Sequence, residues 1–195
     1  MSRLVVAITG ASGAIYAVRF LQRAAEHFDE ILLTASDQAL QVLSTETDLR
    51  ATRDNLTSVL GIEGKARLLN ERDYFTPPAS GSYRHVGMVI VPCSMGTLGR
   101  VANGISNDLT TRAADVCLKE GRKLILVVRE MPYNLVMLRN MVAVAEAGAT
   151  VLPASPAWYY RPSNLEELAD TVVARILQNL GIEQKIVPEW AADKE

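Results

Sequence analysis

The chain alternates between short runs of consecutive apolar residues and longer stretches in which apolar residues recur every three or four positions. Continuous short runs are typical of strands buried on both faces, and the longer periodicity is typical of amphipathic helices. The runs predict strands at residues 3–9, 30–35, 87–93, 123–129 and 149–153. The periodic stretches predict helices at 13–26, 36–45, 52–60, 94–103, 107–121, 134–148 and 164–180.

Strands that alternate with helices predict an α/β fold with a parallel sheet covered on both faces. We expect a three-layer, doubly wound sheet of Rossmann-like or flavodoxin-like type, formed as a single domain over 1–195, with 182–195 as a C-terminal extension. Ligands of such sheets bind beyond the carboxyl ends of the strands, where the strand order reverses. This rule selects five segments as site material, namely 9–16, 35–37, 93–97, 129–134 and 153–161.

Composition and charge restrict the possible partners. A net charge of -2 gives no general reason to expect nucleic acid or an anionic membrane as a partner. Cys93 and Cys117 form no C-x-x-C pair and there are only two histidines, so we expect no metal site. The chain has no apolar run of membrane-spanning length and no secretory-signal pattern at its start, which predicts a cytoplasmic protein.

The turn after the first predicted strand, TGASGAIY (9–16), has the small residues that let backbone amides approach a phosphate. Its glycines are spaced Gly10-x-x-Gly13, and Tyr16 stands where dinucleotide-binding turns carry a third glycine. The Tyr-x-x-x-Lys pair of short-chain dehydrogenases is also absent. The turn therefore favours a mononucleotide, with the Ser12 hydroxyl facing the pocket, although a tight connection without a ligand has the same pattern.

Two further turns have a binding interpretation and a structural one. The segment PCSMGTLGRVANG (92–104) has small and hydroxyl residues between a strand and a helix, which predicts a second amide-rich end at the same crevice. Ser94 is alternatively an ordinary helix cap. Asp37 lies where a ribose-binding acid follows a second strand, whereas Ser36 before it is typical of a cap.

Charged residues in the second half also allow two interpretations. One helical stripe is typical either of a solvated, salt-bridged face or of an anion site, and it holds Asp108, Arg112, Asp115 and Lys119. Arg129 and Glu130 follow a fully apolar strand, where the guanidinium is able to bind a phosphate or to pair with Glu130.

The last third of the chain holds three adjacent aromatic residues in PASPAWYYRP (153–162). Such side chains stack on a planar ring, bind a phosphate or form a hydrophobic subunit contact. Arg175 flanks the apolar face of the last predicted helix, so we expect it to have an anionic partner. The irregular segment 76–85 is a candidate lid or subunit contact.

These segments together resemble the UbiX-type flavin prenyltransferases, part of a flavoprotein family that includes the flavin-dependent cysteine decarboxylases. The resemblance rests on the order and number of the matching pieces over nearly the whole chain. They are TGASGAIY, Ser36, ETD (46–48), PPASGS, PCSMGTL, TRAADVCLKEGRKLILVVRE, PASPAWYYRP, VVARIL and a late Trp190.

The resemblance implies three groups of site residues. The flavin mononucleotide (FMN) site would comprise Gly10, Ala11, Ser12, Ser36, Ser94, Met95, Gly96, Thr97 and Arg129. The pocket for dimethylallyl phosphate would comprise Arg112, Lys119, Glu130, Tyr159, Arg175 and Trp190. The catalytic residues would be Ser12, Glu46, Glu130 and Lys119, with Ser12 and Glu46 close to the flavin N5 and Lys119 offered across a subunit boundary.

The resemblance also implies the reaction. Reduced FMN would be prenylated at N5 and closed at C6 to give prenylated FMN, without a metal, in a homododecamer. A UbiD-type decarboxylase would receive the product. The sequence does not identify that decarboxylase or its pathway, nor whether the donor is a monophosphate or a diphosphate.

Two other functions remain open from the sequence. An FMN-dependent cysteine-type decarboxylase is favoured by NGISND (103–108), but it needs an active-site histidine, for which His85 is the candidate. It also needs a P-x-M-N-x-x-M-W clamp, which MPYNLVML (131–138) does not provide. A non-catalytic flavin-binding subunit of a decarboxylase complex is the other alternative. We expect the segment 83–85 to lie near the pocket rim.

Overall fold

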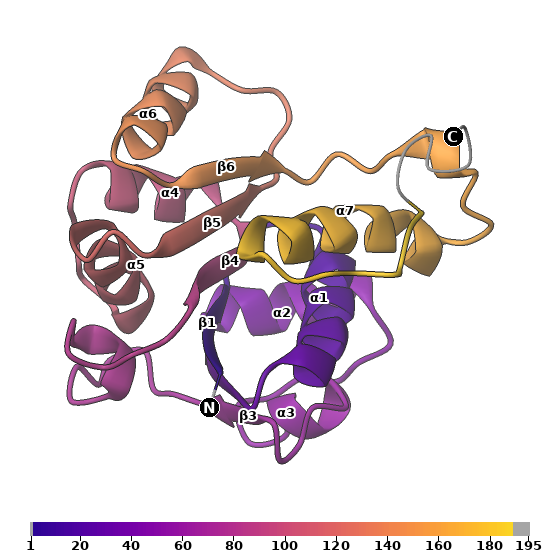
Figure 1. Ribbon diagram of the computed structural model, residues 1–195, viewed down its shortest axis with the longest axis horizontal. Coiled ribbons are helices and arrows are strands. Elements are labelled where there is room, and N and C mark those ends of the chain that lie inside the picture. The colour runs from indigo at the N-terminus through magenta and orange to yellow at the C-terminus, as the bar shows by residue number, and fades with distance from the viewer. Residues whose placement is uncertain (1, 189–195) are drawn as a thin grey trace.

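The structure is a computed structural model that describes residues 2–188, and every strand in it belongs to one sheet (Figure 1). The strands are β1 (Arg3–Ile8), β2 (Glu30–Ala35), β3 (Ala66–Leu68), β4 (Gly87–Cys93), β5 (Lys123–Val128) and β6 (Thr150–Pro153). The α-helices are α1 (Ala14–His27), α2 (Asp37–Glu46), α3 (Leu56–Val59), α4 (Met95–Ala102), α5 (Leu109–Lys119), α6 (Leu135–Glu146) and α7 (Leu165–Leu180). Two short 3-10 helices are η1 (Pro77–Ala79) and η2 (Trp158–Tyr160).

The strand order is β3-β2-β1-β4-β5-β6 and all pairs are parallel. This confirms the predicted doubly wound α/β fold, in the order of a Rossmann sheet, and it places the reversal between β1 and β4. Thr9 connects the two strand ends at this point. Its hydroxyl donates to the carbonyl of Pro92 at 2.7 Å and accepts from the amide of Ser94 at 2.9 Å.

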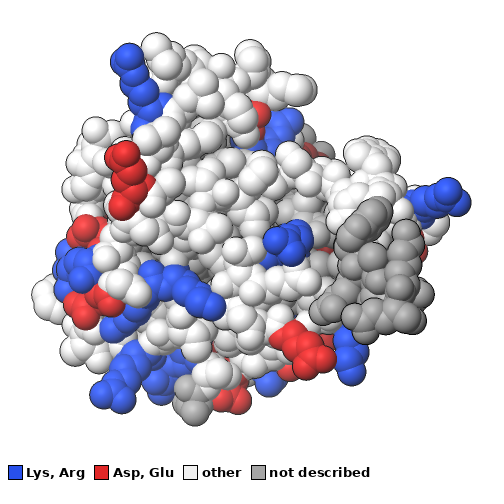
Figure 2. Space-filling view, turned by 45° about the horizontal axis from the view of Figure 1, so that its top comes forward, with Lys and Arg blue, Asp and Glu red and all other residues white. Residues whose placement is uncertain are grey.

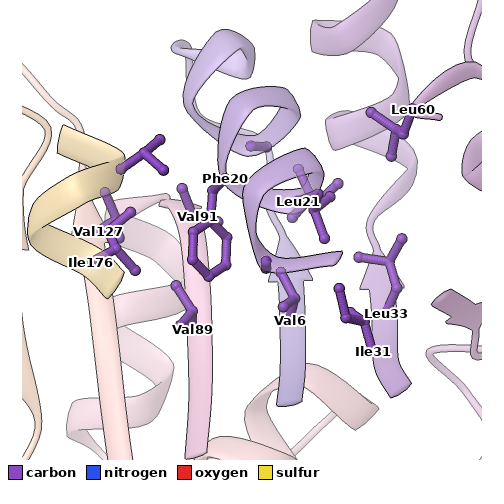
Figure 3. Close-up of a cluster of buried hydrophobic side chains, with 14 of the residues drawn as sticks. Val6, Phe20, Leu21, Ile31, Leu33, Leu60, Val89, Val91, Val127 and Ile176 are labelled. Carbon is purple, nitrogen blue, oxygen red and sulfur yellow. The ribbon is translucent and has the colours of Figure 1, made fainter. Parts of the chain in front are cut away.

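Each face of the sheet has its own hydrophobic core. Helices α1, α2 and α7 cover one face, and α4, α5 and α6 cover the other. On the first face, Phe20 and Leu21 of α1 lie over Val6, Val89 and their neighbours, all almost completely buried (Figure 3). Burial of each side chain of this size contributes about 1.5–3 kcal/mol.

Two predicted elements differ in the structure. The sequence predicted five strands, but β3 is a sixth, and its three residues ARL are too short and too polar to form an apolar run. The helix predicted over 52–60 forms only at Leu56–Val59. The Asn55 side chain accepts from the amide of Thr52 at 2.7 Å and donates to the carbonyl of Arg50 at 3.0 Å, which stabilises a turn instead of a longer helix.

The segment 76–85 does not form a lid over the crevice of its own chain. Its η1 packs on α5, and Arg122 donates to the carbonyls of Gly81 and Tyr83. The ring of Tyr83 lies 4.9 Å from the guanidinium carbon of Arg3, at the amino end of β1. Within one chain, residues 83–85 therefore lie at the opposite end of the strands from the crevice, and their expected position near the pocket rim stays a prediction.

Helix α7 is attached to α1 by a buried carboxylate. Asp170 is only 8% exposed at its side chain, and its two oxygens accept from Arg19 Nε at 2.8 Å and Nη2 at 2.6 Å. Arg23 Nη2 lies 3.5 Å from the same carboxylate. Without the Asp170 charge, Arg19 would lose its ion-pair partner and Arg23 would keep only Glu26.

We therefore expect Asp170→Asn to lower the free energy of unfolding by about 2 kcal/mol, because breaking a buried ion pair leaves its partner uncompensated and partial exposure of the arginines limits the loss. Urea unfolding followed by circular dichroism measures this change. Glu26→Gln is the control, since Glu26 pairs with Arg23 but is 59% exposed, and it should change stability by less than about 0.5 kcal/mol. Equal losses for the two variants would contradict the assignment.

Candidate active site

A cavity of about 320 Å³ lies at the carboxyl ends of β1, β2 and β4, where the sequence predicted a ligand site. It brings together residues from the turns after β1, β2 and β4, from the loop after β3 and from the start of α5. The lining residues are Thr9, Gly10, Ser36, Gln38, Glu71, Ser94, Thr97, Arg100, Asp108 and Thr110.

The starts of α2 and α4 face this cavity with serine caps. Ser36 Oγ accepts from the amide of Ala39 at 3.1 Å, and Ser94 Oγ accepts from the amide of Thr97 at 3.3 Å. The cap interpretation is thus confirmed for both serines, and Asp37 pairs with Arg53 at 2.6 Å. The other first-turn amides of a helix have no partner within the helix, so the two starts together provide donors for an anion.

The glycines of the first turn are required by the backbone of the chain itself. Gly13 has φ +102°, a conformation that other residues rarely adopt, and it precedes the first residue of α1. A Cβ atom on Gly10 would lie 2.6 Å from Cβ of Gln38 in α2. The turn therefore needs glycine at both positions even without a ligand.

Glu46 occupies the amides that the sequence analysis assigned to a phosphate. Its Oε2 accepts from the amides of Gly13 and Ala14, both at 2.8 Å. Burial raises the pKa of Glu46, but hydrogen bonds from the Ser12 hydroxyl and these amides, with the nearby charge of Arg129, outweigh it and leave the pKa below its ordinary value. The structure thus places Ser12, Glu46 and Arg129 together at the start of α1, as the resemblance implied for Ser12 and Glu46.

Arg129 and Glu130 do not close the end of the sheet as a pair. Arg129 lies toward Glu46 and Tyr16, whereas Glu130 Oε1 accepts from the amide of Met131 at 3.0 Å. Burial raises the pKa of Tyr16, and the charge of Arg129 opposes that rise. The guanidinium of Arg129 therefore faces the same turn as Ser12.

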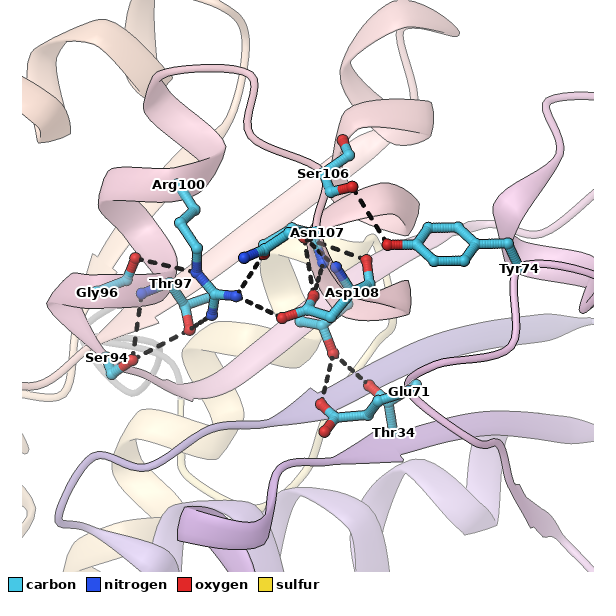
Figure 4. Close-up of polar contacts among 12 residues, drawn as sticks. Thr34, Glu71, Tyr74, Ser94, Gly96, Thr97, Arg100, Ser106, Asn107 and Asp108 are labelled. Carbon is cyan, nitrogen blue, oxygen red and sulfur yellow. Dashed lines mark hydrogen bonds and ion pairs between the residues drawn. The ribbon is translucent and has the colours of Figure 1, made fainter.

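Deeper in the cavity lies a polar network that the sequence analysis missed (Figure 4). Arg100 pairs with Asp108 and donates to Asn107 Oδ1 at 2.8 Å and to Thr97 Oγ1 at 3.1 Å. Its position one turn after the start of α4 was a usable signal, because a cation there faces the same crevice as Ser94. Glu71 offered no such signal, since it follows the unpredicted β3.

The cations of α5 lie away from this cavity. Arg112 donates to the carbonyl of Ala79 at 3.1 Å and pairs with Asp115 at 3.0 Å, and Lys119 pairs with Glu120. Lys119 ends α5 four residues before β5 begins, at the amino end of the sheet. Only the Arg112–Asp115 pair of the predicted stripe forms, because Asp108 caps α5 and binds Arg100.

The aromatic segment 158–160 and Arg175 lie away from both the cavity and the cations of α5. Tyr159 donates to the hydroxyl of Tyr160 at 3.2 Å and lines a hollow of about 1110 Å³ between α1, α7 and residues 181–188. The hollow does not reach the strand ends. Arg175 is exposed in a groove beside β6 and bonds Gln178, so the expected anionic partner is not formed within the described residues. Trp190 lies outside the described residues.

Within residues 2–188 the structure offers neither a reactive thiol nor a cluster of metal ligands. Burial raises the pKa of both Cys93 and Cys117 to about 12, so neither thiol is a ready nucleophile. This part of the chain holds no group of three or more His, Cys, Asp and Glu residues able to bind a metal ion. None of its helices is both long and apolar enough to cross a membrane.

The chain is similar to known proteins over nearly its whole length. The Flavoprotein family profile matches residues 1–187. The flavin prenyltransferase UbiX of Pseudomonas aeruginosa is 45% identical, over 96% of this chain and 93% of that protein. A crystal structure of AnUbiX (PadA1) in complex with FMN and dimethylallyl pyrophosphate is 36% identical, covers 97% of each chain and has a TM-score of 0.89. A dodecameric FMN-dependent UbiX-like decarboxylase from Escherichia coli O157:H7 is 36% identical over 96% and 98% of the chains, with a TM-score of 0.87.

We expect Glu46→Gln to lower the free energy of unfolding at pH 7 by about 0.5–1 kcal/mol, since the carboxylate acts as a solvent-exposed cap of α1. Because the folded-state pKa is lowered, this contribution is present above the unfolded pKa of about 4.3 and is lost as the pH falls through the folded value. Urea titrations at decreasing pH should show the two proteins converging. If the difference in free energy of unfolding between the two proteins stays constant into the acid range, ionised Glu46 does not act as the cap of α1.

Proposed function

Because the chain belongs to the Flavoprotein family and, within it, to the UbiX flavin prenyltransferases, we propose that it transfers the dimethylallyl group of dimethylallyl phosphate to reduced FMN. The observation that carries this proposal is the cluster of Ser12, Glu46 and Arg129 beside a cavity lined by two helix starts. The family resemblance assigns Ser12 and Arg129 to the FMN site, and it assigns Ser12 and Glu46 to a position close to the flavin N5.

The cavity fits the phosphate end of FMN. It offers the first-turn amides of α2 and α4, together with the hydroxyl groups of Ser36 and Ser94, and such donors favour a phosphate. Gly96 has open space beside its Cα, which allows close approach of a ligand to the backbone. Met95 contributes its backbone, because its side chain is in the core.

The flavin ring would then lie toward Ser12, Glu46 and Arg129, with Gly10 and Ala11 beside it. Reduced FMN supplies the nucleophilic N5 and C6 positions that accept the prenyl group. Glu46 has a lowered pKa, so it stays ionised at neutral pH and serves as a fixed acceptor that orients the Ser12 hydroxyl. Ser12 would thereby take the proton that leaves N5 on alkylation while its own hydroxyl proton passes to Glu46.

The departing phosphate needs cations, because the carbon–oxygen bond breaks with charge left on the phosphate. Arg112, Lys119, Arg175 and Tyr159 are assigned to it, with Glu130 and Trp190 beside the prenyl group. Within one chain Lys119 and Arg112 lie apart from Arg129. We propose that another copy of the chain provides Lys119 and Arg112, in a homododecamer like the E. coli neighbour.

Exposed apolar side chains agree with such an assembly. Helix α6 buries only Val144, whereas Leu135, Val136 and Val142 are each more than half exposed, and so is Met131 just before the helix. The face shown in Figure 2, with the side of α6 turned forward, is mostly uncharged away from its rim. Apolar surface of this kind is typical of interfaces between subunits.

The cysteine-decarboxylase alternative is weakened by the position of His85. Its Nδ1 lies 3.0 Å from the carbonyl of Gly87, at the amino end of β4 and away from the crevice. We therefore favour the prenyltransferase, with a UbiD-type decarboxylase as the recipient of prenylated FMN.

Anaerobic incubation of the protein with reduced FMN and dimethylallyl phosphate should convert FMN to a product heavier by one prenyl group, as measured by mass spectrometry. The control omits the protein. FMN recovered with unchanged mass, from a protein shown to bind FMN, would reject the proposed reaction.

Arg175→Ala should raise the KM for dimethylallyl phosphate by at least about tenfold while changing the Kd for FMN by less than about twofold, because a charged hydrogen bond contributes about 1.5–3 kcal/mol. Steady-state kinetics and flavin fluorescence measure the two quantities. Arg67→Ala is the control, since Arg67 is 53% exposed on the edge strand β3. If KM for dimethylallyl phosphate and Kd for FMN rise by the same factor, Arg175 does not belong to the prenyl phosphate site.

A further inference from the structure

Glu71 is a partly buried carboxylate in the cavity assigned to FMN, and the proposed function gives it no role. Its side chain is 17% exposed and lines the same cavity as Ser36 and Ser94. Its backbone carbonyl accepts from the amide of Leu109 at 2.7 Å, which fixes the loop after β3 to the start of α5. The position of the carboxylate in the cavity is therefore defined.

The partners of Glu71 do not neutralise its charge. Thr110 Oγ1 lies 3.3 Å from Glu71 Oε1 and bonds Thr34 at 2.8 Å (Figure 4). The nearest cation is Arg53, whose Nη2 is 3.9 Å from Glu71 but 2.6 Å from Asp37. Arg53 is thus committed first to the exposed Asp37.

The remaining charges around the cavity are unfavourable for an ionised Glu71. On the α4 and α5 side, Asp108 also lines the cavity, and Arg100 is paired with it. Burial raises the pKa of Glu71, the charge of Asp108 raises it further, and Arg53 opposes both. A phosphate in the same cavity would add up to two negative charges and disfavour the ionised form again.

We propose that Glu71 is a cofactor-site residue that faces the phosphate end of FMN as a neutral acid, so that binding of FMN takes up a proton at this side chain. A neutral carboxyl is also a hydrogen-bond donor, which an ionised one is not, so protonation changes repulsion of the phosphate into attraction. The inference rests on the proposed FMN site and does not depend on prenyl transfer.

The test compares FMN binding by the wild-type protein and Glu71→Gln between about pH 5 and about pH 8. Glutamine keeps the shape of the neutral acid but cannot ionise, and titration of the FMN phosphate itself, with a pKa of about 6, affects both proteins equally. The two proteins should bind FMN alike near pH 5. The wild-type Kd should become at least about fivefold larger than that of Glu71→Gln near pH 8, within the tenfold per pH unit that linkage allows.

Calorimetry in two buffers of different ionisation enthalpy measures the proton directly, and the uptake seen with the wild type should be lost in Glu71→Gln. Glu26→Gln is the control. Glu26 is 59% exposed, pairs with Arg23 and does not line the cavity, so its removal should change the Kd by the same factor at every pH. Riboflavin, which lacks the phosphate, should bind wild type and Glu71→Gln with a ratio that does not change with pH.

A wild-type to Glu71→Gln ratio for FMN that stays constant with pH would overturn the proposal, as would equal proton uptake by both proteins. The same change in ratio with riboflavin would also overturn it, because the effect would not come from the phosphate. A protein that binds no FMN would reject both this inference and the proposed function. A protein that shows the expected pH dependence but does not prenylate FMN would reject only the proposed reaction.

Discussion

The reversal of strand order between β1 and β4 is the constraint on which the rest of the structure depends. From this point the sheet extends through β2 and β3 on one side and through β5 and β6 on the other. The connections after β1 and β4 therefore run in opposite directions, and the turns between them leave a space that no helix fills. Thr9 holds the two strand ends together by donating to Pro92 and accepting from Ser94. The crevice is therefore a product of the topology, and its chemistry depends on which residues follow each strand.

The amides at this crevice have different roles. At the start of α1, Glu46 accepts from the amides of Gly13 and Ala14 and from the Ser12 hydroxyl, with the charge of Arg129 nearby, so these amides are already paired. The starts of α2 and α4 carry only serine caps, which satisfy one amide each and leave others for a ligand. An anion is thus favoured between α2 and α4, and a reacting group is favoured beside Ser12.

Sequence alone predicted most of the fold and part of the site. Long apolar runs such as 87–93 and 123–129 predicted their strands because burial on both faces leaves no polar alternation. The three-residue β3 lacks that signal, and Glu71 was missed with it. The anionic partner expected for Arg175 is not among the described residues of its own chain, because helical periodicity places a residue at the edge of a buried face but does not say whether another element covers it.

The distribution of cations has a consequence for catalysis. Arg129 faces the crevice, Arg175 lies beside β6, and Lys119 ends α5 at the opposite side of the sheet. A helix that connects parallel strands runs back along their length, so Lys119 at the end of α5 and Arg129 after β5 lie at opposite ends of the strands and do not meet within one chain. If Lys119 and Arg175 stabilise the departing phosphate beside a flavin bound by Arg129, the reaction requires contact between copies. The apolar face of α6 then serves catalysis as well as stability, because assembly is what completes the set of cations around the phosphate.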